Sequence, residues 1–163
     1  MAHGEPVLHL LCGKIASGKS THAEQLGNQI GHVKIAEDDW LAVLFADQMT
    51  SISDYVRCSA KLQQIMGPHV VQLLNTGISV VLDFPANTIP QRAWMREIID
   101  QTGVEHQLHY FDVPDDVCIE RLHNRNALGE HPFTATEEQF AMISKHFVPP
   151  TDEEGFHIVR YES

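Results

Sequence analysis

Short apolar runs alternate with amphipathic segments along this chain of 163 residues. The runs with the length of buried strands cover residues 7–12, 33–36, 78–82, 107–113 and 156–161. Strands that alternate with helices favour a parallel sheet with helices on both faces. The predicted fold class is therefore α/β, with three layers and a five-stranded parallel sheet.

Helix-like spacing fills the segments between these runs. The predicted helices cover residues 19–30, 39–45, 54–75, 90–101, 114–125 and 136–147. Asp38 or Asp39 can cap the second of these helices. An interruption is predicted in the third, at Gly67 and Pro68, because proline cannot donate a hydrogen bond to the preceding turn. No repeat or linker divides the sequence, so we expect one domain over residues 1–163.

Composition and charge narrow the class of protein. Apolar residues make up 43% of the chain, and none of their runs approaches the roughly 20 residues that cross a bilayer. With no signal-like N-terminus either, we expect a cytoplasmic protein without a membrane partner. Eleven Lys and Arg against 22 Asp and Glu give a formal net charge of −11, with no basic stripe. A nucleic-acid partner is therefore not expected, and a small-molecule substrate is favoured. The pattern does not predict an oligomeric state.

The most specific motif lies between the first predicted strand and the first predicted helix. Residues 13–20 read Gly-Lys-Ile-Ala-Ser-Gly-Lys-Ser and fit G-x-x-x-x-G-K-[ST], the phosphate-binding loop of P-loop NTPases. Gly13 and Gly18 permit a backbone that points N–H groups at phosphate oxygens, and the positive end of the helix faces the same anion. Lys19 supplies a cation for the β- and γ-phosphates, and the Ser20 hydroxyl can ligate Mg²⁺.

This motif predicts a P-loop NTPase fold with ATP and Mg²⁺ as cofactors. The predicted nucleotide-binding residues are Gly13, Ala16, Ser17, Gly18, Lys19, Ser20 and Thr21.

Acidic residues follow two of the predicted strands, at the edge of the sheet where ligands bind. Asp38 and Asp39 come after the second strand, and Asp83 ends the third. A carboxylate there can accept a proton from an incoming hydroxyl or help to hold Mg²⁺. We expect Asp83 at the magnesium site and in contact with the substrate. We expect one of Asp38 and Asp39 to be only a helix cap, and the pattern leaves open which of them is the base.

Two arginines lie four residues apart on one predicted helix face, Arg121 and Arg125. A guanidinium group matches the charge that spreads over a transferred phosphoryl group. Ion pairs with Glu120 or Asp116 on a solvated face would explain the same spacing. The polar, glycine-containing residues 126–134 that follow favour a mobile lid at about 122–136. Both arginines are candidate catalytic residues; Arg125 is favoured, and whether Arg121 contacts ATP is left open.

Together these segments resemble the AAA_33-type P-loop kinases, a group that includes polynucleotide kinase, chloramphenicol phosphotransferase, gluconate kinase and the zeta toxins. The resemblance runs over residues 7–125 and more weakly to 154. Residues 35–40 are similar to the Asp-Asp-aromatic segment of the polynucleotide kinase branch, in which the first aspartate is the general base. That resemblance implies Asp38 as the base. Trp40 adjoins it and is a candidate wall of the acceptor pocket.

Residues 83–92 resemble the acid, asparagine and arginine segment that lines the acceptor side in this family. The resemblance implies that Asp83 and Arg92 bind the substrate. One departure is informative: the polynucleotide branch carries an arginine soon after the acidic pair, where this chain has Leu41 and Ala42. A polynucleotide acceptor is therefore disfavoured.

The predicted function is transfer of the γ-phosphoryl group of Mg·ATP to a hydroxyl of a small molecule. A nucleoside, nucleotide or nucleic-acid end kinase is the alternative enzyme and differs only in the acceptor. An ATP-dependent binding switch is the alternative of another class. Such a switch would hydrolyse ATP slowly and show no preferred acceptor.

Overall fold

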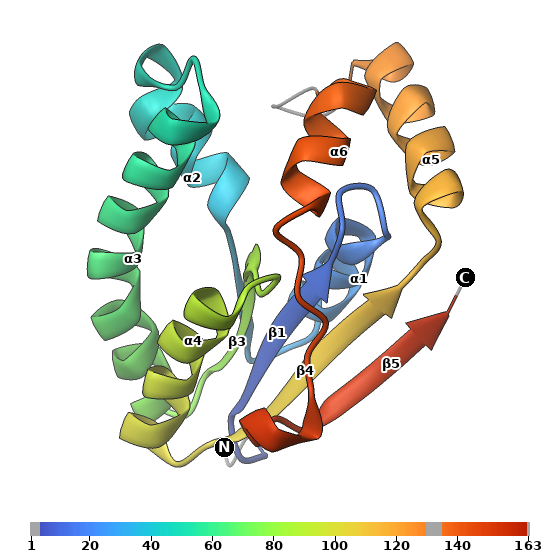
Figure 1. Cartoon of the computed structure of the whole chain (residues 1–163). Helices are drawn as coiled ribbons and strands as arrows, with labels where there is room; N and C mark the ends of the chain where they lie inside the picture. Colours follow the sequence, from blue (N-terminus) through green and yellow to red (C-terminus); the bar gives the residue numbers. More distant parts are fainter. Residues whose placement is uncertain (1–3, 130–134, 163) are drawn as a thin grey trace.

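The computed structural model describes residues 4–129 and 135–162. Its five strands form one sheet in the order β2-β3-β1-β4-β5, and every neighbouring pair is parallel (Figure 1). The strands are β1 (Val7–Gly13), β2 (His32–Ala36), β3 (Ser79–Pro85), β4 (Glu105–Asp112) and β5 (Ile158–Glu162). The predicted α/β class with a five-stranded parallel sheet is confirmed.

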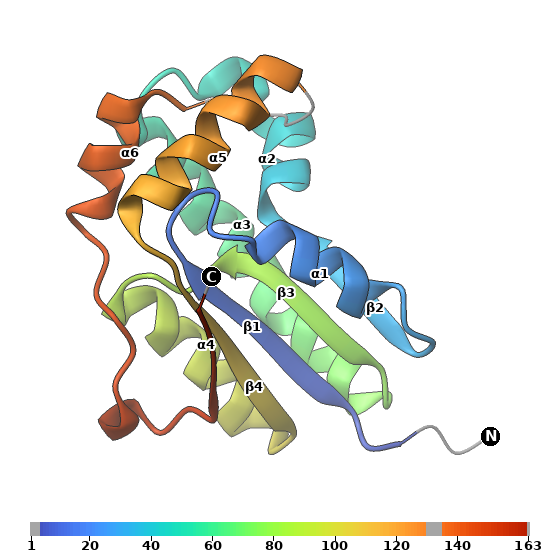
Figure 2. The same cartoon turned by 90° about the vertical axis from the view of Figure 1, so that its right-hand side faces the viewer.

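Helices cover both faces of the sheet, as the predicted three layers require. The helices are α1 (Lys19–Gly27), α2 (Glu37–Phe45), α3 (Ile52–Asn75), α4 (Ile89–Thr102), α5 (Asp115–Leu128) and α6 (Glu137–Ser144). Figure 2 shows α1 on one face of the sheet, with α3 and α4 on the other. A hydrophobic core lies on each face of the sheet, and alternate residues of β1 point into one or the other. Leu8 and Leu10 pack with α3 and α4, whereas Leu11 packs with α1 and α5.

The helix α3 is continuous through Pro68, so the predicted interruption is wrong. Proline in a helix interior costs about 3 kcal/mol. Here the apolar stripe continues on both sides of it, because Leu62 and Met66 before Pro68 and Val70 and Leu74 after it are all buried in one core. Packing of this apolar stripe against the core offsets the tendency of Pro68 to break the helix.

The strand β2 leads directly into α2, so the acidic residues at its end lie inside the helix and not at its cap. The N-cap of α2 is Ala36, and Asp38 and Asp39 lie inside the first turn. Neither is the cap, so the predicted capping is wrong. Carboxylates in a first turn are favoured by the positive end of the helix dipole.

The predicted lid region is partly helical. The helix α5 runs to Leu128 and ends at Gly129, which has φ 65°. Residues 126–128 are therefore helix rather than loop, and residues 130–134 of the predicted lid lie outside the described residues. Within the described part of the chain, no helix has the length and apolar character needed to cross a membrane.

Candidate active site

The loop between β1 and α1 has the tight backbone expected of a phosphate-binding loop. Ala16 has φ 62° and Gly18 has φ 109°, both in the left-handed region. A side chain on Gly13 would place its Cβ 2.5 Å from Ser17 Oγ, so only glycine fits there. The positive φ of Ala16 costs an alanine about 1–2 kcal/mol, and strain of this kind is typical of functional loops.

The end of α1 that faces this loop presents hydrogen-bond donors. The first backbone bond of the helix runs from His22 N–H to Gly18 O at 3.2 Å. The N–H groups of the first turn, from Lys19 to Thr21, precede that bond and point out of the helix end. Ser17 Oγ is buried and makes no hydrogen bond within the described residues. Unpaired donors at a helix N-terminus, beside an orphaned hydroxyl, suit an anionic phosphate group.

Lys19 curls over the loop that it follows. Its Nζ donates to the carbonyl oxygen of Gly13 and, at 3.2 Å, to that of Lys14. Burial lowers the pKa of Lys19, and the nearby carboxylates of Asp83 and Asp38 oppose that shift. The ammonium group is thus held where phosphate oxygens can replace its carbonyl partners.

The two predicted acidic positions meet at the same edge of the sheet. Ala36 of β2 pairs with Asp83 of β3, and Asp38 follows Ala36 by two residues. Burial raises the pKa of Asp83, whereas Lys19 opposes the rise and Asp38 adds to it. The structure therefore brings Lys19, Asp38 and Asp83 within electrostatic reach of one another, at the mouth of the phosphate-binding loop.

Both candidate arginines of α5 face this cluster. Arg121 Nη1 donates to the carbonyl oxygen of Ser17 at 3.3 Å. Arg125 is half-buried; desolvation lowers its pKa, and the carboxylate of Asp38 opposes that shift. Its Nε has no hydrogen-bond partner among the described residues. The helix thus holds one guanidinium over the loop and the other toward Asp38.

Arg92 is bonded inside the protein, and its predicted contact with substrate stays a prediction. The residue is 1% exposed. Its Nε bonds to Glu154 Oε1 at 2.8 Å, and its Nη1 bonds to the carbonyl oxygens of Ala86 at 2.9 Å and Val148 at 2.8 Å. The guanidinium is therefore used inside the protein, where it ties the segment after α6 to the loop between β3 and α4.

Asn87 takes a position different from the acceptor side that the resemblance implied for its segment. Its side-chain amide bonds to both backbone groups of Gly13, at 2.9 Å each. Asn87 is therefore part of the support of the phosphate-binding loop. The position of Asn87, one residue before the N-cap Thr88 of α4, carried no signal of this contact in the sequence.

Glu37 is a second residue that the sequence reasoning did not single out. It is 1% exposed and accepts hydrogen bonds from Tyr55 Oη and, at 2.8 Å, from Ser59 Oγ. Burial raises the pKa of Glu37 to about 7. A signal was present: Glu37 lies four residues before Leu41, which is fully buried, so both lie on the same face of α2.

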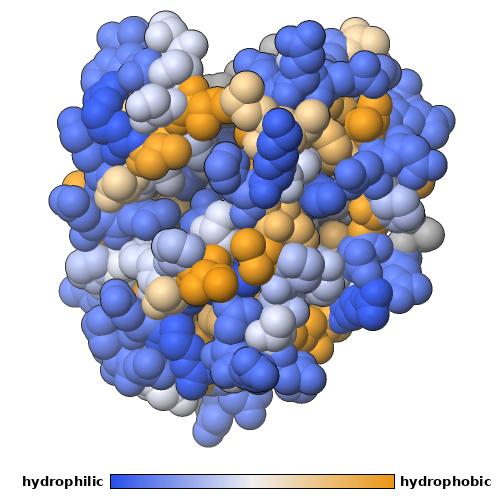
Figure 3. Space-filling model, viewed as in Figure 1, coloured by the Kyte–Doolittle hydropathy of each residue, from blue (hydrophilic) through white to orange (hydrophobic). Residues whose placement is uncertain are grey.

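The surface between α2 and α3 on one side and α5 and α6 on the other is hollowed and partly apolar. Figure 3 shows a hollow between the part formed by α2 and α3 and the part formed by α5 and α6, with hydrophobic surface along its walls. On α2, Trp40 is 41% exposed and Leu44 is 50% exposed. The role of Trp40 as a wall of an acceptor pocket stays a prediction.

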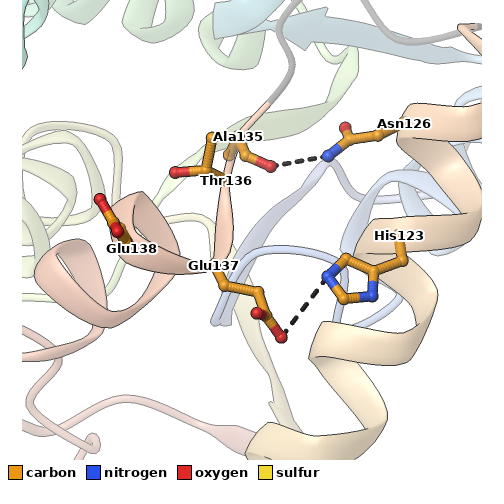
Figure 4. A pocket seen from close by; sticks show the side chains of 6 residues that line it. All are labelled: His123, Asn126, Ala135, Thr136, Glu137 and Glu138. Atoms are coloured by element: carbon orange, nitrogen blue, oxygen red, sulfur yellow. Dashed lines mark hydrogen bonds and ion pairs between the residues drawn. The ribbon is translucent and has the colours of Figure 1, made fainter.

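A separate pocket lies between α5 and α6 (Figure 4). Its lining residues are His123, Asn126, Ala135, Thr136, Glu137 and Glu138. A His123–Glu137 contact of 3.5 Å and a bond of 2.7 Å from Asn126 Nδ2 to the Ala135 carbonyl oxygen cross it. None of the phosphate-loop residues lines this pocket, so it is distinct from the candidate site.

Among the described residues, no group of three or more His, Cys, Asp or Glu side chains is arranged to hold a metal ion by itself. A magnesium ion at Ser20 and Asp83 would need further oxygens from phosphate or water, which is how Mg²⁺ usually binds beside nucleotides.

Comparisons with known proteins agree with this fold. The AAA_33 model, described as an AAA domain, matches residues 8–150. The chain therefore belongs to the AAA_33 family. No curated protein sequence matches the chain significantly.

Solved structures of kinases share the fold. A predicted kinase from Chloroflexus aurantiacus superimposes with a TM-score of 0.76 at 17% identity, covering 98% of this chain and 89% of that one. The APS kinase CysC of Mycobacterium tuberculosis, in complex with AMPPNP and APS, gives a TM-score of 0.64 at 17% identity over 98% of this chain and 90% of that one. A chain of the Pnkp1/Rnl/Hen1 RNA repair complex gives a TM-score of 0.62 at 20% identity, covering 88% of this chain and 43% of that one.

Proposed function

We propose that this protein is an ATP-dependent kinase that transfers the γ-phosphoryl group of Mg·ATP to a hydroxyl of a small molecule. The observation that carries the proposal is the convergence of Lys19, Asp38 and Arg125 at the mouth of one phosphate-binding loop. A cation inside the loop, a carboxylate and a second cation from another helix are the groups that phosphoryl transfer requires.

Asp38 is the base in this proposal. Its carboxylate interacts with both Lys19 and Arg125, whereas Asp39 is exposed. The carboxylate accepts the proton of the acceptor hydroxyl as that oxygen forms its bond to phosphorus. Lys19 and Arg125 then stabilise negative charge on the phosphoryl oxygens, because both cations are already in place and need little reorganisation. Arg121 holds the loop backbone at Ser17.

The residues present suit the cofactors that this reaction needs. Backbone N–H groups from Lys19 to Thr21 and the ammonium of Lys19 would bind the phosphates, and Ser20 with Asp83 would hold Mg²⁺. Bound Mg·ATP would supply the phosphoryl group and partly neutralise the phosphate charge. A cytoplasmic location, where ATP is abundant, is part of the same proposal.

The acceptor side supports a small molecule rather than a polynucleotide end. Leu41, at the position where the polynucleotide branch has arginine nearby, is fully buried in the core. Arg57, the first arginine of α3, bonds to Asp54 at 3.3 Å and to the Gln48 carbonyl oxygen. Without a cation offered by α2, an acceptor phosphate has less to bind on this wall, and the exposed Trp40 and Leu44 suit an apolar acceptor surface.

The proposal is tested by acceptor profiling with ATP labelled in its γ-phosphate. Hydroxylated metabolites, nucleosides and 5′-hydroxyl oligonucleotides form separate arms. Label transfer to a small alcohol by the wild type, lost in Lys19→Ala, supports the proposal, and transfer only to an oligonucleotide supports the alternative kinase. Binding of ATP with slow hydrolysis and no labelled acceptor would instead identify a switch.

A further inference from the structure

Glu37 is a buried acid that the proposed transfer reaction does not use directly. A buried carboxylate is costly unless hydrogen bonds replace its water. Two hydroxyl groups do so here, because Tyr55 Oη and Ser59 Oγ both donate to the Glu37 carboxylate. Such a fully bonded buried acid normally serves to hold elements in one arrangement.

The arrangement that Glu37 holds is the contact between α2 and α3. Tyr55 and Ser59 are four residues apart, so they lie one turn from each other on the same face of α3. Glu37 is the first residue of α2 and follows β2 directly. Its two bonds therefore fix the first turn of α2 at the point where the chain leaves the sheet.

Asp38 is the next residue of that same turn. Its carboxylate interacts with Lys19 of the phosphate-binding loop and with Arg125 of α5. Neighbouring residues in a helix are rotated by about 100° from one another, so a turn clamped at Glu37 also fixes the direction of Asp38. A small rotation of this turn would move the base relative to both cations.

We propose that Glu37 is a positioning residue for phosphoryl transfer: held by Tyr55 and Ser59, it fixes the first turn of α2 and keeps Asp38 directed at Lys19 and Arg125. This inference rests on the proposed function for its kinetic consequence. Its structural consequence, the placement of Asp38, is independent of whether the protein turns out to be a kinase.

The electrostatics of the site limit how Glu37 can act on Asp38. The groups that face Glu37 are Tyr55 and Ser59 from α3, Asp38 from its own helix and Asp83 from β3. Burial raises the pKa of Glu37 to about 7, and the charges of Asp38 and Asp83 add to the rise. Glu37 is therefore neutral in acid, where it acts on Asp38 through position rather than through charge.

The kinetic test compares Glu37→Gln and Glu37→Ala with the wild type and with Asp47→Asn. Asp47 is an exposed acid just after α2, so its variant matches the loss of charge without touching the clamp. We expect kcat to fall about tenfold in Glu37→Gln and further in Glu37→Ala, because small misplacements of a reacting group are costly, with KM for ATP unchanged. The acid limb of the pH profile should move to higher pH in Glu37→Ala, because a displaced Asp38 carboxylate loses the nearby positive charges of Lys19 and Arg125.

Tyr55→Phe and Ser59→Ala provide independent variants of the same clamp. Each should lower kcat less than Glu37→Gln, and combining either with Glu37→Gln should add little, since the groups act as one unit. A Glu37→Ala protein with wild-type kcat and an unmoved pH profile would overturn the kinetic part. A rise in KM for ATP with no change in kcat would show that Glu37 acts on nucleotide binding rather than on Asp38, and would overturn it as well.

A measurement on nucleotide-free protein separates this proposal from the kinase assignment. The Asp38 carboxyl carbon is titrated by NMR in the wild type, in Glu37→Ala and in Asp47→Asn. We expect a higher Asp38 pKa only in Glu37→Ala, because loss of the clamp moves the carboxylate away from Lys19 and Arg125, even if no acceptor is ever phosphorylated. An Asp38 titration identical in all three proteins would overturn the proposal, whereas the expected shift in a protein without transfer activity would overturn only the kinase.

Discussion

The side-chain amide of Asn87 forms a two-point contact with the backbone of Gly13, with Oδ1 accepting from the Gly13 N–H and Nδ2 donating to the Gly13 carbonyl, each at 2.9 Å. The parallel ladder between β1 and β3 ends just before this point, with a bond of 3.2 Å from Ala86 N–H to the Leu11 carbonyl oxygen. A carboxamide has the donor and acceptor of a peptide group. Asn87 therefore continues the ladder by one residue into the phosphate-binding loop.

The first prediction concerns this contact. Asn87→Ala removes the acceptor of the Gly13 N–H and leaves Lys19 Nζ as the donor to the Gly13 carbonyl oxygen, so the loop is less well placed for phosphate. We expect the Kd for Mg·ATP to rise about tenfold, which is 1.4 kcal/mol. Calorimetric titration measures it. Thr88→Ala is the control, since Thr88 caps α4 by accepting from Gln91 N–H and does not touch the loop.

Thr88→Ala should lower the melting temperature while its Kd stays near that of the wild type. If Asn87→Ala bound Mg·ATP as tightly as the wild type, the ladder extension would have no part in nucleotide binding.

The second prediction separates the two arginines of α5. Arg125 faces Asp38, whereas Arg121 bonds to the backbone of Ser17. Arg125→Ala should therefore lower kcat, by about a hundredfold or more, because a guanidinium that stabilises the transferred phosphoryl group contributes most in the transition state. Arg121→Ala should mainly raise the Kd for Mg·ATP. Steady-state kinetics together with nucleotide titration distinguish these outcomes, and equal effects of the two variants on kcat would contradict the assignment.

The third prediction concerns Arg92, whose guanidinium is bonded inside the protein. Arg92→Ala leaves Glu154 without its buried partner and two carbonyl oxygens without a donor. Breaking such a pair costs about 3–5 kcal/mol in the free energy of unfolding. Urea unfolding should show this loss. A stable Arg92→Ala protein with a raised KM for the acceptor would instead place Arg92 at the substrate site.

The fourth prediction concerns a histidine network beneath α1. His9 Nδ1 and His109 Nε2 are 3.0 Å apart, and His109 Nδ1 is 2.9 Å from Tyr161 Oη. Burial lowers the pKa of His9 to about 4 and that of His109 to about 3. Between pH 6.5 and these values the unfolded chain binds protons that the folded chain excludes. The contribution of these neutral histidines to the free energy of unfolding is therefore complete above pH 6.5 and is lost as the pH falls.

At pH 5 the loss should be about 2 kcal/mol for each of these histidines relative to pH 7.5. Urea unfolding of the wild type and of His109→Asn at the two pH values measures it. Glu37, whose pKa is raised to about 7, opposes this trend, so the difference between the two proteins is the informative quantity. A pH dependence of the same size in His109→Asn would show that His109 is not responsible.

The parts of this site that could be predicted from sequence are those set by local or regular geometry. The phosphate-binding loop is one contiguous segment, so the spacing of Gly13, Gly18 and Lys19 is enough to recognise it in the sequence. Asp38 and Asp83 could be placed at one edge because the carboxyl ends of parallel strands lie side by side. The three layers could also be predicted, because strands that alternate with helices along the chain form a parallel sheet with helices on both faces.

The parts that could not be predicted depend on partners far away in the chain. Arg92 looked available for substrate because its partner Glu154 lies 62 residues later. The uninterrupted α3 depends on a core shared with other elements, which outweighs the local effect of Pro68. Glu37 lay on an apolar helix face, and only the structure shows the two hydroxyl groups that make its burial tolerable.

The central claim, that the loop from Gly13 to Thr21 binds Mg·ATP, is tested most directly by calorimetric titration of Lys19→Ala beside Lys14→Ala. Lys14 is in the same loop, but its Nζ pairs with the half-exposed Asp115 at 2.7 Å, and exposed pairs contribute little. We predict that the wild type and Lys14→Ala bind Mg·ATP with Kd values within a few-fold of each other, and that Lys19→Ala loses binding while keeping its far-UV circular dichroism. Equal binding by Lys19→Ala and the wild type would contradict the account.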